Sequence, residues 1–230
     1  ACHAGAVAFT GFAPEILTFY EGLEADNSRT YWLAHKPFYD EHVRGAMLAL
    51  GEALGDRFQP VHVFRPNRDV RFSKDKTLYK TQCGAVHERD GGAINYVAIS
   101  AKGLFVGTGM YMLAKDQLER FRAALADDAT GPAFVDAVGQ VQQAKVGVDP
   151  GAEPPLKRAP KGIAVDHPRI EWLRWKGAIA SKDFGTPAWI HTAKAITRIR
   201  ETWDAAEPLN RWLEAHVGPS HQAPPEADAF

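Results

Sequence analysis

Apolar residues in roughly the first sixty positions recur at the three- and four-residue spacing of amphipathic helices. Pro14 and Glu15 are typical of a first helical turn, and Asp26-Asn27 ends the apolar stripe that follows. Ser28 is expected to cap a second helix, and Pro37 to reset the chain before a longer helix over residues 38–58. The apolar stripes consist of Ile16, Leu17, Phe19, Tyr20 and Leu23 in the first helix and Val43, Met47, Leu50 and Leu54 in the last.

From Val61 onward the apolar period changes to two, which is typical of strands with one buried face. The alternation involves Val61, Val63, Val70 and Phe72, and further strands are predicted over residues 83–87, 94–100 and 104–108. Turn residues separate these runs, at Asp90-Gly91-Gly92 and at Lys102-Gly103. Short strands joined by tight turns favour an antiparallel meander with helices on one face.

Helical spacing returns in the second half of the chain. Helices are predicted over residues 115–126 and 133–144, an ordered loop over 149–160, a short helix over 168–175 and a strand over 177–184. A long helix is expected over residues 187–216, kinked or divided by Pro208. We therefore predict one α+β domain over residues 1–217, with an antiparallel sheet of about four to six strands packed by N-terminal, middle and C-terminal helices. Residues 218–230 are expected to form a flexible, proline-rich, acidic tail.

Composition and charge fit an ordinary globular protein of 230 residues, with 45% hydrophobic and 24% charged residues. No apolar run approaches the roughly 20 residues of a membrane helix, so no membrane partner is expected. Cys2 and Cys83 form neither a disulfide framework nor a metal-binding pair, which favours a reducing, cytoplasmic location. His35 and His42 lack a third ligand, so no metal site is predicted.

The strongest candidate for chemistry is the basic segment 65–80. It holds six basic residues against two aspartates, so it carries a net charge of +4 in a chain whose total is −1. Because it follows the alternating pattern, we expect it to start in a strand, with its cations grouped to bind an anion. The candidate anion-binding residues are Arg68, Arg71, Lys74, Lys76 and Lys80, oriented by Asp69 and Asp75. Alternatively, the aspartates neutralise the arginines in solvated surface pairs.

A second basic cluster, Lys157 and Arg158, leads into a predicted helix start near His167. His167 is a candidate acid or base, although histidines at such positions more often have a capping role. Tyr79 and Tyr96 are candidate hydrogen-bond donors to a ligand. We expect the two basic clusters to meet in one cleft over the sheet.

Several stretches of the chain resemble one family. They are residues 19–33, the block Arg68-Asp69-Val70-Arg71-Phe72-Ser73-Lys74-Asp75-Lys76-Thr77-Leu78-Tyr79-Lys80, the stretch Gly107-Thr108-Gly109-Met110-Tyr111, and Leu156-Lys157-Arg158-Ala159-Pro160 through His167-Pro168. Through these stretches the chain resembles the uncharacterised proteins catalogued as domain of unknown function 2461. The resemblance extends roughly from position 9 to position 212. The resemblance implies no reaction, but it raises the odds that the two basic clusters lie together.

The leading hypothesis is a cationic cleft that binds a small phosphorylated or carboxylated metabolite, in an enzyme or a ligand-binding protein. A single-stranded nucleic-acid module is a less favoured alternative, because most of the chain outside segment 65–80 is acidic overall. A third hypothesis is a scaffold that binds partners through its tryptophan-rich terminal helix. Neither a cofactor nor an oligomeric state follows from the sequence.

Overall fold

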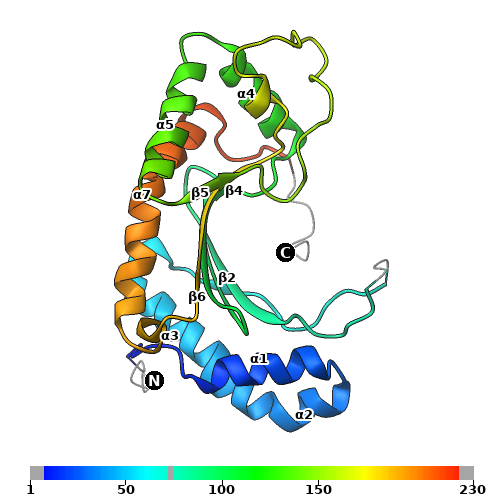
Figure 1. Cartoon of the computed structure of the whole chain (residues 1–230), viewed down its shortest axis with the longest axis vertical. Helices are drawn as coiled ribbons and strands as arrows, with labels where there is room; N and C mark the ends of the chain where they lie inside the picture. Colours follow the sequence, from blue (N-terminus) through cyan, green and yellow to red (C-terminus); the bar gives the residue numbers. More distant parts are fainter. Residues whose placement is uncertain (1–7, 72–74, 223–230) are drawn as a thin grey trace.

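Six antiparallel strands form one curved sheet in the computed structural model, which describes residues 8–71 and 75–222 (Figure 1). The strand order is β1-β2-β3-β4-β6-β5. The bounds are β1 His62–Val63, β2 Gln82–Glu88, β3 Ile94–Ser100, β4 Gly103–Met110, β5 Gly147–Asp149 and β6 Ala178–Gly185. The predicted α+β class and the antiparallel sheet with its helices are confirmed.

The strands β2, β3 and β4 form the predicted meander. Cys83 pairs with Ile99 and Ala85 pairs with Val97, and all four side chains are buried on the same face of the sheet. Period-two alternation therefore sets the register of these strands, because a slip by one residue would expose this apolar set. The short strand β5 was not predicted, and it extends the sheet beyond β6.

The N-terminal helices cover one end of this buried face. They are α1 Glu15–Ala25, α2 Arg29–Phe38, the π-helix η1 Tyr39–Arg44, α3 Gly45–Leu54 and the short 3₁₀ helix η2 Gly55–Arg57. The Ser28 hydroxyl accepts a hydrogen bond from the Tyr31 N–H at 3.1 Å, which confirms the predicted cap.

The prediction that Pro37 resets the chain is wrong. Pro37 lies inside α2, and the helical path continues through η1 into α3. The N–H of Tyr39 donates to the carbonyls of both His35 and Lys36, so helical hydrogen bonding resumes directly after the proline. The following π-helical turn widens the backbone spacing, which is a common way for a helix to absorb a local irregularity.

Helices in the second half of the chain surround a second apolar cluster. They are α4 Lys115–Ala126, α5 Gly131–Gln143, α6 Ile170–Leu173, the 3₁₀ helix η3 Ala188–His191 and α7 Lys194–His216. Phe134 of α5 packs edge-on against Trp212 of α7, with ring centroids 4.8 Å apart. Trp203, nearer the start of α7, belongs instead to the first apolar cluster, which also contains the buried residues of α1 and α3. The long helix α7 thus joins both clusters, and Pro208 does not divide it.

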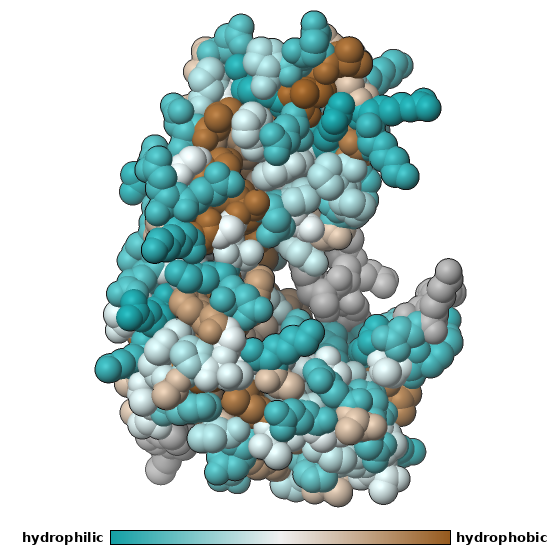
Figure 2. Space-filling view, viewed as in Figure 1, coloured by the Kyte–Doolittle hydropathy of each residue, from teal (hydrophilic) through white to brown (hydrophobic). Residues whose placement is uncertain are grey.

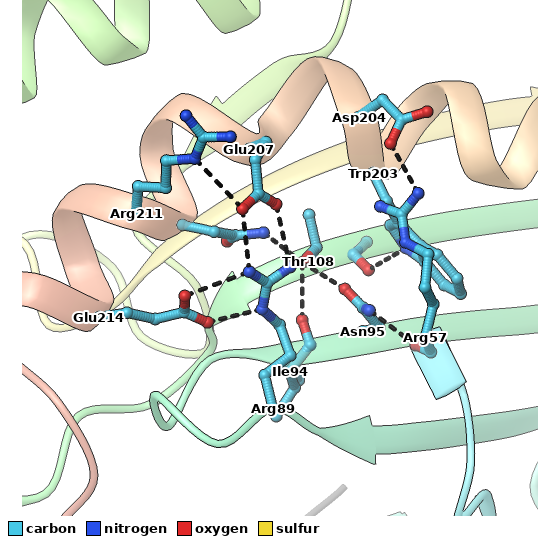
Figure 3. Close-up of polar contacts among 12 residues, drawn as sticks. Arg57, Arg89, Ile94, Asn95, Thr108, Trp203, Asp204, Glu207, Arg211 and Glu214 are labelled. Carbon is cyan, nitrogen blue, oxygen red and sulfur yellow. Dashed lines mark hydrogen bonds and ion pairs between the residues drawn. The ribbon is translucent and has the colours of Figure 1, made fainter. Parts of the chain in front are cut away.

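Polar side chains fasten α7 to the sheet (Figure 3). Asn210 of α7 donates to the Thr108 hydroxyl at 2.8 Å, and that hydroxyl donates to Asn95 at 2.8 Å. All three residues are buried. Beside them, Arg89 lies between Glu207 and Glu214, which are two turns apart on α7. These contacts favour one orientation of α7 on the sheet, although the buried Oδ1 of Asn210 has no hydrogen-bond partner among the described residues.

The start of the predicted tail is bound to α4. The Asp116 carboxylate accepts hydrogen bonds from the Ser220 hydroxyl at 2.8 Å and from the His221 N–H at 2.9 Å. Arg120 donates to the Pro219 carbonyl at 2.8 Å. Residues 218–222 therefore have specific partners, which the sequence did not predict. Residues 223–230 lie outside the described part of the chain, and the flexibility expected for them stays a prediction.

Across the residues that the structure describes, we find no helix with both the length and the apolar character needed to cross a bilayer.

Candidate functional site

The described residues of the basic segment, 65–71 and 75–80, form an arm that projects from the end of the molecule holding α1 and α2 (Figure 1). Two backbone hydrogen bonds close its base, from the Arg68 N–H to the Leu78 carbonyl at 2.9 Å and from the Lys80 N–H to the Pro66 carbonyl at 2.8 Å. The expectation that this segment starts in a strand is wrong, because its described residues form only one isolated bridge, between Asn67 and Tyr79. Figure 2 shows a mostly hydrophilic surface over the arm and a hollow between it and the opposite end of the molecule.

Within the arm, two of the three arginines, Arg68 and Arg71, form ion pairs with the arm's own aspartates. The guanidinium of Arg71 donates to both carboxylate oxygens of Asp69, at distances of 2.6–3.1 Å. These hydrogen bonds lower the pKa of Asp69 to about 2. Arg68 pairs with Asp75 and donates to the Thr77 hydroxyl.

The predicted neighbours are thus in contact, but as exposed ion pairs, which contribute little to stability. The arginine of the Arg71–Asp69 pair is 74% exposed.

The other predicted cations of the arm have separate positions. Lys76 donates to the Val70 carbonyl at 2.8 Å, inside the arm. The ammonium of Lys80 lies over the Phe64 ring, 5.1 Å from its centroid. Lys74 falls outside the described residues, as do Phe72 and Ser73. Among the described members of the predicted anion-binding set, Lys80 lines the pocket at the base of the arm.

Tyr79 anchors the base of the arm to the helices. Its backbone N–H donates to the Asn27 side chain at 2.9 Å, and its carbonyl accepts from the same side chain at 3.1 Å. Its ring stacks on Trp32 with centroids 4.5 Å apart and an interplanar angle of 14°. Only 6% of Tyr79 is exposed, so these contacts position the arm, and the donation to a ligand that was expected of Tyr79 stays a prediction.

A pocket of about 450 Å³ opens where the arm leaves the body, and we call it the arm-base pocket. Helix α2 and η1 form one wall, and β1 with the two ends of the arm forms the other. Four cations line it, together with one carboxylate and several aromatic residues. The lining residues are Trp32, Lys36, Tyr39, Asp40, Arg44, His62, Val63, Phe64, Arg65, Pro66, Asn67 and Lys80.

Cations outnumber carboxylates among the residues that line the arm-base pocket. Lys36 pairs with Asp40 four residues later on the same helical path. Arg44, one turn further, has no acidic partner among the described residues, and its side chain is exposed. Arg65 and Lys80 add two more cations from the arm side. Such convergence of positive charge in a concave site is suited to an anion.

Behind this pocket, the ionisable groups are held neutral. Burial raises the pKa of the Cys83 thiol to about 12, although Tyr39, Arg44 and Lys80 act against the shift. Burial and then Cys83 raise the pKa of the Tyr39 hydroxyl well above its usual range. Neither group is therefore ionised near neutral pH, and a thiolate nucleophile is not available here. The described residues contain no group of His, Cys, Asp and Glu side chains arranged to hold a metal ion.

The second basic cluster lies elsewhere. Lys157 and Arg158 are exposed on the loop at the α4–α5 end of the molecule, whereas the arm projects from the α1–α2 end (Figure 1). The structure does not bring these two clusters together, because the loop and the arm extend from opposite ends of the curved sheet.

The remaining candidates have local contacts of their own. His167 accepts a hydrogen bond at Nδ1 from the Arg169 N–H at 3.0 Å, which is a local turn contact just before α6. Tyr96 lies on β3, where its hydroxyl accepts from Gln82 at 3.2 Å. Burial raises the pKa of Tyr96, so this hydroxyl stays protonated at neutral pH. His167 and Tyr96 are both absent from the lining of the arm-base pocket.

Two pocket cations, Lys36 and Arg44, were missed by the sequence analysis. They flank Asp40 at four-residue spacing, so all three lie along one side of a continuous helical path. That charged stripe was visible in the sequence. It was overlooked because Pro37 was expected to break the register.

The fold and the site define an α+β protein with a cationic pocket at the edge of an antiparallel sheet. The family described as "Conserved hypothetical protein (DUF2461)" matches residues 15–212, and the chain belongs to this family. The resemblance seen in the sequence is thereby confirmed. Comparisons with curated proteins and with solved structures give no match.

Proposed function

We propose that the arm-base pocket binds a small phosphorylated or carboxylated metabolite. The observation that carries this proposal is the set of four cations, from two separate walls, around a pocket that contains one carboxylate. A volume of about 450 Å³ lies within the range of pockets that hold small metabolites. The proposal moves the anion site from the middle of the arm, where sequence placed it, to the arm's base.

Electrostatics support an anion as the occupant. Cations that share one partly enclosed pocket repel one another when only water separates them, and an anion removes this repulsion. Guanidinium groups also offer paired N–H donors that match carboxylate and phosphate oxygens. The nearly buried rings of Trp32, Tyr39 and Phe64 strengthen these interactions, because they exclude water from the pocket walls.

Single-stranded nucleic acid is the weaker candidate. Its backbone would be expected to follow a row of available cations with aromatic rings exposed for stacking. In the arm, Arg68 and Arg71 contact aspartates, and the Tyr79 ring is stacked on Trp32. These contacts favour a small ligand at the base over a polymer along the arm.

Thermal denaturation of the purified chain with a set of phosphates, nucleotides and carboxylates tests the proposal. A ligand at one hundred times its Kd stabilises the native state by about 2.7 kcal/mol. For a chain of this length that corresponds to a rise in Tm of roughly 5–10 °C. The active anion should then be titrated by calorimetry against wild type and variants.

Arg44→Gln removes one pocket cation, and Arg71→Gln makes the same chemical change in the arm. Losing a charge-assisted hydrogen bond of about 1.5–3 kcal/mol should weaken binding by Arg44→Gln at least tenfold. Arg71→Gln should retain wild-type affinity. Both side chains are exposed, so both variants should fold. Equal affinities for wild type and Arg44→Gln, or a selective loss in Arg71→Gln, would reject this location.

A further inference from the structure

We infer that a second anion site, separate from the arm-base pocket, lies where α4 meets the end of α6, and that Arg122 and Arg174 bind a phosphate group there. This end of the molecule lies opposite the arm (Figure 1), so the site does not depend on the proposed function. Three observations carry the inference: neither arginine has an acidic partner, both are held inside the protein at Nε, and a loop with two further cations passes beside Arg174.

Most arginines that the fold partly shields from solvent pair with a carboxylate. Arg122 and Arg174 are the exceptions, because both are half-buried and no ion pair joins either one to another described residue. Glu119 and Glu171 each lie three residues before one of these arginines, but both glutamates are exposed and neither forms an ion pair with it. The shielded arginines that do have carboxylate partners are Arg57, Arg68, Arg89, Arg120 and Arg169.

Arg122 contacts the backbone directly before Arg174. Its Nε donates to the carbonyl of Leu173 at 3.3 Å. The Nε of Arg174 is buried without a hydrogen-bond partner among the described residues. The outer Nη atoms of both arginines have no partner in the described chain either, but they are not buried, so they reach solvent. Each guanidinium group is therefore held at its inner nitrogen while its outer donors remain available to an anion.

Electrostatics favour phosphate as the ligand of this pair. Burial lowers the pKa of Arg122, and no neighbouring carboxylate acts against this shift. Two cations held near each other without a counterion repel, and a bound anion removes that repulsion. A phosphate dianion can balance both guanidinium charges, whereas one carboxylate balances a single charge. Guanidinium N–H groups also match phosphate oxygens in a paired geometry.

The neighbouring loop adds two more cations. The Leu156 N–H donates to the Arg174 carbonyl at 2.8 Å, so Lys157 and Arg158 follow directly after this contact. Both are exposed, and neither forms an ion pair with a described residue. Glu153, in the same loop, is already paired with another lysine. Because lysine and arginine side chains are long and flexible, these loop cations can add charge to an anion that the arginine pair holds.

Arginine side-chain NMR of the full chain tests this site without relying on the arm-base pocket. The Nε–H resonances of Arg122 and Arg174 are assigned from the variants Arg122→Gln and Arg174→Gln, then followed as inorganic phosphate, methyl phosphate or acetate is added at pH 8. Both resonances should shift and saturate with the same Kd, and acetate should bind about tenfold more weakly than phosphate. The exposed Arg198, paired with Glu201, is the control, and its resonance should not show a saturable shift.

Variants separate this site from the arm-base pocket. In Arg174→Gln, the Arg122 resonance should report phosphate binding that is at least tenfold weaker, because charge-assisted hydrogen bonds are lost. In Arg44→Gln, both resonances should titrate as in the wild type. Neither Arg122→Gln nor Arg174→Gln leaves a carboxylate unpaired, so both variants should fold with a Tm close to that of the wild type. A lower Tm in Arg174→Gln together with unchanged phosphate affinity would show a purely structural arginine and overturn the inference.

Saturation of both resonances by either phosphate probe supports the inference, and the tighter probe distinguishes free phosphate from a phosphate ester. Absence of a saturable shift at millimolar phosphate, or its loss in Arg44→Gln, would overturn the second site. Acetate binding as tightly as both phosphate probes would overturn the assignment to a phosphate group.

Discussion

Replacing Arg89 by methionine should destabilise the fold more than any exposed ion pair does. The Arg89 guanidinium makes four hydrogen bonds to Glu207 and Glu214, with N–O distances from 2.5 to 3.2 Å (Figure 3). The three side chains are only 19%, 27% and 21% exposed. Burial acts to lower the pKa of Arg89, but the hydrogen bonds from Glu214 and Glu207 outweigh it and raise that pKa.

The magnitude follows from the partial burial of this cluster. Arg89→Met removes the cation that Glu207 and Glu214 share, so the two carboxylates repel each other. Breaking a buried ion pair by removing one partner costs about 3–5 kcal/mol. Because the cluster retains some solvent contact, we expect the lower end, about 3 kcal/mol. At roughly 2–4 °C per kcal/mol for a chain of this length, the Tm should fall by about 6–12 °C.

Chemical denaturation of wild type, Arg89→Met and Arg198→Met provides the assay. Arg198 pairs with Glu201 on the same helix, but those side chains are 53% and 54% exposed, so its loss should cost about 1 kcal/mol or less. Replacing Glu207 and Glu214 by leucine in the Arg89→Met background should recover most of the lost stability, because the carboxylates that lost Arg89 are then removed, although the exposed Arg211 also loses its pair with Glu207. Equal losses in Arg89→Met and Arg198→Met would refute this reasoning.

Two further predictions concern the arm and the C-terminal segment. Asn27→Ala should lower the free energy of unfolding by about 1–3 kcal/mol, because the buried backbone groups of Tyr79 lose their hydrogen-bond partner. The same change should weaken anion binding at the arm-base pocket. Unchanged affinity in a titration would show that the base of the arm is positioned without Asn27. Truncation after residue 222 should leave the Tm unchanged, whereas truncation after residue 217 should lower it, because Asp116 loses its partners. Those partners, first the His221 backbone, hold the pKa of Asp116 below its usual range, so their stabilisation is complete above about pH 4 and decreases as the pH falls further. Identical acid denaturation of the two truncated chains would contradict this assignment.

Local periodicity was enough to predict most elements of the fold. The helix predicted over residues 115–126 coincides with α4, and the strand predicted over 94–100 coincides with β3. Each of the two elements buries its apolar positions in one of the two apolar clusters, so the spacing of those positions along the sequence carries the information. The strand β5 has three residues, which is too few for a period, and it exists only through its pairing with β6.

The prediction for Pro37 was wrong, and Pro208 does not divide α7, for a related reason, whereas a kink at Pro208 stays a prediction. Pro37 and Pro208 each remove one backbone N–H donor, but both lie in helices whose flanking apolar residues are buried. Tertiary packing outweighed the tendency of proline to interrupt a helix, because the helical residues on both sides of it bury apolar side chains in the core. Sequence alone did not reveal how much burial each helix would obtain.

The candidate site was found only in part. Charge density identified segment 65–80, and its last residue, Lys80, does line the arm-base pocket. The pairing of Arg71 with Asp69 was open to prediction, because an aspartate two residues earlier commonly accepts from the backbone N–H, as it does here at 3.1 Å. The presence of Arg44 and Lys80 in the lining of one pocket was not predictable, because it depends on tertiary packing between parts of the chain that are far apart in sequence.

The most direct test of the central claim is a crystal structure of the chain soaked with tungstate, a tetrahedral dianion whose position anomalous diffraction locates without bias. The account predicts a tungstate peak in the arm-base pocket, within hydrogen-bond distance of Arg44 and of at least one of Arg65 and Lys80. A peak at Arg71 or at Lys157 and Arg158, with none in the arm-base pocket, would contradict it.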